Sequence, residues 1–96
     1  MEENKNIDEK LRLNIRKIFR GQLALEDYSD LRGENPDIIS QMMKKIGDYR
    51  KIKPTLTKEQ LLELTNNLCE MLEQTYTTLG KEHFTFYDDG DVLYKG

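Results

Sequence analysis

A capped helical pattern over residues 57–80 constrains the fold of this chain more than any other feature of the sequence. Thr57 and Gln60 form a capping box, in which each side chain hydrogen-bonds a backbone amide at the start of a helix. Apolar residues then recur at helical spacing as far as Gly80, and Leu62 and Cys69 widen the apolar arc to nearly half of the circumference. A helix with so wide an apolar face is expected at the centre of the fold or in a contact between two chains.

Three further helices are predicted upstream. Asn6 and Glu9 form a capping pair for the first, and apolar residues follow it at helical spacing up to Gly21. Gly33 can end the second in left-handed geometry, and Asn35-Pro36 marks the start of the third. The expected bounds are residues 7–20 for the first helix, 23–31 for the second, and 36 to a point between 47 and 52 for the third. Residues 7–80 are therefore expected to hold four helices.

The last stretch of the chain has the pattern of a β-hairpin. Asp89-Gly90 lies between two runs of β-favouring residues and is a strong signal for a two-residue turn. In this register Tyr87 lies opposite Val92 and Phe86 opposite Leu93, so both faces carry large apolar side chains. We expect one face to pack on the chain's own helices and the other on a second copy. The hairpin is predicted over residues 84–95, with dimer contacts at Phe84, Phe86, Tyr87, Val92, Leu93 and Tyr94.

Length and composition predict one small, mainly α domain over residues 1–96, with four helices and a C-terminal β-hairpin. Of its 96 residues, 24 are Leu, Ile, Val or Phe, which favours a folded chain over a disordered one. A domain of this size leaves much apolar surface uncovered, so a homodimer is expected. The N-terminal stretch is acidic and polar, and no apolar run approaches the roughly 18 residues of a membrane span. A cytoplasmic protein without membrane contact is expected.

The residue types that carry catalysis and metal binding are sparse. Cys69 is the only cysteine and lies on an apolar helix face, where cysteine usually packs as a small hydrophobe. His83 is the only histidine, and the sequence places no serine, cysteine or second carboxylate beside it, so it is interpreted as a surface or turn residue. Asp88, Asp89 and Asp91 lack the ligand spacing of a calcium loop and are interpreted as turn residues. We expect neither an enzyme nor a metal or cofactor site.

The middle of the chain resembles a known family. Residues 25–45, LEDYSDLRGENPDIISQMMKK, resemble the helix-turn-helix of Cro/cI-type (Xre-type) regulators. In this helix-turn-helix-like segment, residues 24–46, Gly33 matches the turn glycine, and Ile39 and Met42 match the buried positions of the recognition helix. Tyr28 and Ser29 match a bulky apolar and a small position of the family. The resemblance extends to NIRKIF (14–19) and to PTLTKEQLLELTNNL (54–68).

This resemblance implies a DNA-binding transcription regulator that acts as a homodimer on an operator-type duplex. Gln41 would read adenine, while Ser40 and Lys44 would contact base or phosphate. Glu34 stands where the family buries an aliphatic residue, so Glu34→Val is expected to raise stability by about 1 kcal/mol. The residues implied for DNA contact are Asn35, Ser40, Gln41, Lys44, Lys45, Arg50 and Lys51, with Lys53, Arg12, Arg16 and Arg20 beside the groove.

The distribution of charge leaves a second class of function open. Residues 1–53 carry 12 basic and 10 acidic side chains, a sum of +2, whereas residues 54–96 carry 3 and 8, a sum of −5. A surplus of acid argues against coating nucleic acid by charge alone. Small acidic helical proteins also include inhibitors that neutralise another protein. The alternative is therefore a protein-binding inhibitor or adaptor of the immunity or counter-defence type, encoded by a phage or other mobile element, without DNA binding.

Overall fold

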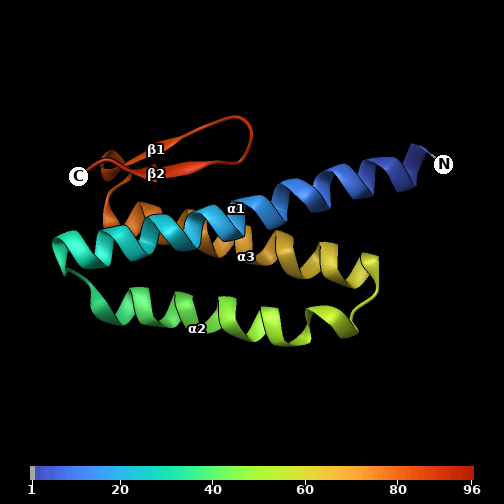
Figure 1. Cartoon of the computed structure of the whole chain (residues 1–96), viewed down its shortest axis with the longest axis horizontal. Coiled ribbons are helices and arrows are strands. Elements are labelled where there is room, and N and C mark those ends of the chain that lie inside the picture. The colour runs from blue at the N-terminus through green and yellow to red at the C-terminus, as the bar shows by residue number, and fades with distance from the viewer. Residues whose placement is uncertain (1) are drawn as a thin grey trace.

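The computed structural model describes residues 2–96, which form three α-helices followed by a two-stranded antiparallel sheet (Figure 1). The mainly helical fold with a C-terminal hairpin is confirmed, but the prediction of four helices is wrong for the described residues. The helices are α1 (Glu2–Arg32), α2 (Pro36–Ile52) and α3 (Lys58–Leu79), and the strands are β1 (Phe84–Phe86) and β2 (Val92–Tyr94). Short 3-10 turns over Lys53–Thr55 and Lys81–His83 complete the order.

The two helices predicted before residue 33 are one continuous helix. Gly21, expected to end the first of them, is buried in the middle of α1. A glycine costs a helix about 1 kcal/mol relative to alanine but leaves the backbone hydrogen bonds intact. Here the missing side chain has a packing role, because a Cβ at Gly21 would lie 2.5 Å from the Tyr76 hydroxyl of α3. The glycine lets α1 and α3 approach each other closely.

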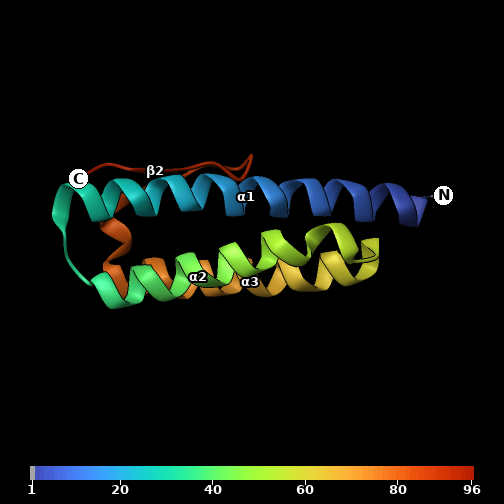
Figure 2. The ribbon, with the colours of Figure 1, turned by 60° about the horizontal axis from the view of Figure 1, so that its bottom comes forward.

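The three helices lie along the long axis of a molecule that measures 45 × 27 × 16 Å, and each runs in the opposite direction to the one before it (Figures 1 and 2). In a helix-turn-helix the two helices cross at roughly 90–120°, whereas α1 and α2 run side by side in opposite directions in both views. Gly33 and Asn35 reverse the chain with left-handed φ angles of 65° and 53°. The arrangement of residues 24–46 therefore differs from the one that the resemblance implied.

Glu34 lies in this connection and is exposed, with its carboxylate 3.3 Å from the Arg32 guanidinium. The resemblance put this residue at a buried aliphatic position. Because the carboxylate is already solvated, Glu34→Val relieves no buried charge. The expected gain in stability from that substitution loses its physical basis.

The start and end of α3 are confirmed. The Thr57 hydroxyl accepts a hydrogen bond from the backbone amide of Gln60 at 3.1 Å, and the backbone amide of Thr57 donates to the side-chain oxygen of Gln60 at 3.0 Å. Gly80 follows the last residue of the helix with a φ of 105°. Consistent with its wide apolar face, α3 packs against both other helices.

The core joins all three helices to the inner face of the sheet. Its buried apolar members are Ile18, Ala24, Leu25, Tyr28, Ile39, Met42, Ile46, Tyr49, Leu68, Leu72, Tyr76, Leu79, Phe84 and Val92. Three polar side chains, Asn14, Thr65 and Thr75, are buried with them. The Asn14 amide donates to the Thr65 hydroxyl at 3.1 Å and to the Asn66 side-chain oxygen at 2.7 Å, and so ties α1 to α3.

The hairpin lies where the sequence predicts it, but the predicted register is wrong by one residue. Phe86 pairs with Val92 and Phe84 with Tyr94. The Gly90 amide donates to the Tyr87 carbonyl, and the Tyr87 amide donates to the Asp91 carbonyl, so the loop has three residues and not two. A shift of one residue moves side chains to opposite faces. Phe84 and Phe86 share the inner face with Val92 and Tyr94, while Leu93 lies exposed on the outer face, so both faces carry large apolar side chains.

Candidate functional site

The hairpin loop is held to α1 by two ion pairs. The Arg20 guanidinium lies 3.0 Å from the Asp91 carboxylate, and that of Arg16 lies 3.4 Å from Asp89. Both arginines were placed beside a DNA groove by the resemblance, so this structural role is a finding that sequence reasoning missed. The available signal was the opposite charge of two segments, the arginines at positions 12, 16 and 20 and the aspartates at positions 88, 89 and 91. Nothing in the sequence indicated that these two segments are in contact.

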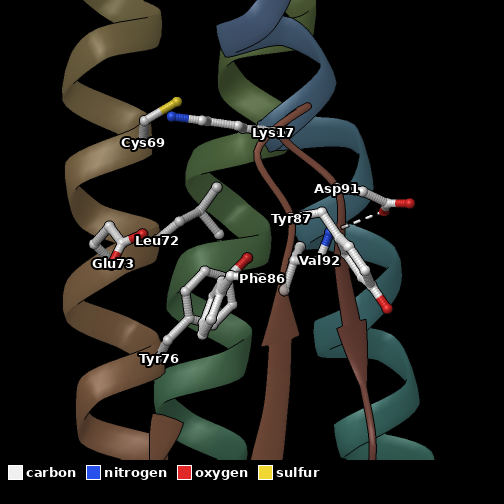
Figure 3. A pocket seen from close by; sticks show the side chains of 10 residues that line it. Lys17, Cys69, Leu72, Glu73, Tyr76, Phe86, Tyr87, Asp91 and Val92 are labelled. Carbon is white, nitrogen blue, oxygen red and sulfur yellow. Dashed lines mark hydrogen bonds between the residues drawn. The ribbon is translucent and has the colours of Figure 1, made fainter.

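A pocket of about 170 Å³ lies between the docked hairpin and α3 (Figure 3). Its apolar wall includes Leu72 and Tyr76 from α3 and Phe86 and Val92 from the sheet. The rings of Tyr76 and Phe86 meet edge to face, with centroids 5.2 Å apart. Phe86 is 43% exposed, so the wall opens to solvent on the side of β1. The complete lining is Lys17, Cys69, Leu72, Glu73, Tyr76, Phe86, Tyr87, Gly90, Asp91 and Val92.

The rim of the pocket is polar and carries both signs of charge. Lys17 extends from α1 toward Cys69 on α3, and Glu73 lies on the same helix one turn further along (Figure 3). The Glu73 carboxylate is 3.1 Å from the amino group of Lys81. This end of the pocket adjoins a shallower groove between α1 and α3, because both are lined by Lys17, Cys69 and Glu73. A bound group would therefore meet an apolar floor and charged side chains at the entrance.

Burial favours the neutral form of two groups that line the pocket, Cys69 and Tyr76. Burial raises the pKa of the Cys69 thiol, against an opposing effect of the Lys17 ammonium, and the thiol lies 3.8 Å from the Asn14 carbonyl oxygen. Burial likewise raises the pKa of the Tyr76 phenol. A thiol with a raised pKa is a poor nucleophile at neutral pH. The pocket is therefore chemically suited to binding an apolar group.

The residues that the resemblance assigned to DNA lie mostly along the outer side of α2. Their side chains are exposed, but Asp37 and Asp48 are exposed on the same helix, so this surface is of mixed charge. Asn35 has a different role, because its side-chain amide donates to the Tyr28 hydroxyl at 3.0 Å. All seven predicted DNA contacts are exposed: Asn35, Ser40, Gln41, Lys44, Lys45, Arg50 and Lys51.

The predicted dimer contacts divide into two groups. Phe84 and Val92 are buried against the chain's own helices, and Tyr94 is half-buried and packs on the core, so the assignment of these three to a dimer contact is corrected. Phe86, Tyr87 and Leu93 remain between 43% and 49% exposed. Leu93 is exposed because it lies on the outer face in the observed register, whereas Phe86 lies on the inner face and is exposed where it lines the pocket.

Among the residues whose side chains the structure describes, no group of three or more His, Cys, Asp or Glu residues comes together that could hold a metal ion. None of the described helices has a stretch both long and apolar enough to cross a bilayer.

Comparison with known proteins gives no relative for this chain. No protein-family model matches it, and no curated protein or solved structure is significantly similar. The function is therefore inferred from the geometry alone.

Proposed function

We propose that this chain is a protein-binding module of the inhibitor or adaptor type, which takes an apolar anchor side chain of its partner into the pocket beneath the hairpin. The observation that carries the proposal is the pocket itself, with its aromatic wall of Tyr76 and Phe86 and its charged rim. Interfaces between proteins are typically centred on one such pocket, filled by an aromatic or aliphatic side chain and surrounded by polar contacts.

The size of the pocket fits an anchor of this kind. An apolar cavity of about 150 Å³ accommodates a benzene ring, and this pocket measures about 170 Å³. One aromatic or branched side chain would fill it. Lys17 and Glu73 at the rim can then hydrogen-bond the backbone or polar side chains next to the anchor.

DNA binding stays a prediction with less support. A recognition helix presents a basic or neutral polar face to the groove, whereas the exposed side of α2 also carries Asp37 and Asp48. Arg16 and Arg20, which could have added positive potential, are paired with aspartates of the hairpin loop. An inhibitor or adaptor needs neither a basic helix face nor unpaired arginines.

Affinity capture tests the proposal. The immobilised chain is exposed to lysate of its source organism, with and without nuclease treatment, and the retained proteins are identified by mass spectrometry. Phe86→Ser removes one wall of the pocket and should release the specific partner, because loss of a hot-spot aromatic contact costs about 2 kcal/mol or more of binding free energy. Nuclease should not change the result.

Leu31→Ser is the matched control. Leu31 is 74% exposed at the end of α1 and does not line the pocket, so its replacement removes a similar apolar side chain without touching the site. Both variants are first shown to melt cooperatively. Retention of the same partner by the Phe86→Ser variant would contradict the pocket as the binding site, and material that disappears on nuclease treatment would favour DNA.

A further inference from the structure

The outer side of α1 carries an apolar pair that the monomer covers only in part. In Figures 1 and 2 the hairpin lies along one side of α1 and α2 along the other. Phe19 and Leu23 lie one helical turn apart on α1 and are 51% and 38% exposed. Neither side chain takes part in the pocket beneath the hairpin.

Charged residues flank this pair in an ordered way. Positions 12, 16, 19, 23, 26 and 30 are separated alternately by four and three residues, which places them in one stripe along a helix. The stripe reads Arg12, Arg16, Phe19, Leu23, Glu26, Asp30, so that two basic residues precede the apolar pair and two acidic residues follow it. The four charged side chains are all exposed.

This order is complementary to itself when the helix is reversed. The midpoint of the apolar pair is Gly21, with Arg16 and Glu26 each five residues from it and Arg12 and Asp30 each nine residues from it. At 1.5 Å per residue these distances are about 7.5 Å and 13.5 Å on either side. Two such stripes that meet antiparallel therefore bring every basic residue to an acidic one, whereas a parallel arrangement sets like charges against each other.

We propose that the outer stripe of α1 binds the same stripe of a second copy of this chain, antiparallel, about a two-fold axis that passes between Phe19 and Leu23, at the level of Gly21 along the helix. Phe19 of each copy then packs against Leu23 of the other, Arg16 meets Glu26 and Arg12 meets Asp30. A two-fold contact uses one patch twice, so each pairing occurs twice in the dimer. The proposal moves the homodimer contact from the hairpin, where the sequence predicted it, to α1.

The pair Arg12–Asp30 is the best probe of this arrangement. Arg16 already contacts Asp89 within its own chain, but neither Arg12 nor Asp30 has an ion pair with another described residue whose side chain is placed. A contact made by one helix from each copy is small, and charge contributes much of its specificity. The dimer should therefore be weak and sensitive to ionic strength.

Sedimentation velocity over a concentration series, at low and at high salt, provides the test. The intact chain should dimerise, and high salt should weaken the dimer. Arg12→Glu and Asp30→Lys should each weaken it by about tenfold or more, because each change replaces two attractive contacts by two repulsive ones. An equimolar mixture of these two single variants should dimerise like the wild type, since both pairings are then restored between unlike chains.

That restoration on mixing is specific to the antiparallel register. Lys44→Glu, a charge reversal on α2, serves as the matched control and should leave the dimer unchanged. Phe19→Ser should abolish the dimer while the melting temperature at low protein concentration stays near that of the wild type. A chain that is monomeric at all concentrations, or single charge reversals without effect, would overturn the proposal without touching the proposed binding pocket.

Discussion

At the scale of single residues, the contact between Gly21 and Tyr76 shows how an absent side chain organises the bundle. A Cβ at position 21 would lie 2.5 Å from the Tyr76 hydroxyl and 3.2 Å from Leu72. Tyr76 cannot easily move, because its ring is buried against Phe84 with the centroids 5.0 Å apart. Close approach of α1 and α3 and the position of one pocket wall therefore depend on the same glycine.

Gly21→Ala should lower the free energy of unfolding by about 1 kcal/mol, since a steric cost of about 1–3 kcal/mol exceeds the helix-propensity gain of about 1 kcal/mol. In a Tyr76→Phe background the loss should be smaller, which a double-mutant cycle by urea denaturation would measure. Gly47→Ala is the control, because a Cβ at position 47 would meet no other atom within 4 Å. This substitution should stabilise α2 by about 0.5–1 kcal/mol. Equal effects of the two alanines would contradict the packing role of Gly21.

At the scale of elements, the hairpin depends on the geometry of its loop. Gly90 has a φ of 92°, and a Cβ there would lie 2.8 Å from the Leu13 side chain of α1. Gly90→Ala should therefore cost about 1–3 kcal/mol through backbone strain and the clash together. Thermal unfolding monitored by near-ultraviolet circular dichroism checks this, because the sheet packs aromatic rings on Tyr28 and Tyr76. An unchanged melting temperature would mean that the loop does not seat on α1 in this way.

At the scale of the whole molecule, burial of tyrosines makes stability depend on alkaline pH. Burial raises the pKa of both Tyr49 and Tyr76 in the folded chain, whereas tyrosine in an unfolded chain titrates near pH 10. Below that pH both states are protonated and stability is constant. Above it the unfolded state loses the proton first, so the free energy of unfolding falls as pH rises.

Urea denaturation at pH 8 and at pH 11 should therefore give a lower free energy of unfolding at the higher pH. Tyr76→Phe should reduce this difference, because it removes the phenol whose pKa burial raises further. The measurement uses low protein concentration and high salt, so that self-association does not contribute. A pH dependence as steep in the variant as in the wild type would contradict the assignment to Tyr76.

The sequence by itself predicted the features that short-range interactions determine. The capping box at Thr57, the start of α2 at Pro36 and the place of the hairpin depend on residues within a few positions of each other, and all three are confirmed. The same local rules erred at Gly21, where a glycine is compatible both with a helix end and with a close helix contact. Only the partner at that position, Tyr76, distinguishes the two.

The tertiary structure decided how these elements meet. The register of the hairpin differs from the predicted one. The observed register places Phe84, Phe86, Val92 and Tyr94 together on the inner face, where the sheet packs against helices that are distant in sequence. The candidate pocket and the ion pairs of Arg16 and Arg20 form because the hairpin packs against α1 and α3. Contacts between residues 50 or more positions apart depend on how the packed elements fit, and a local pattern carries no information about that fit.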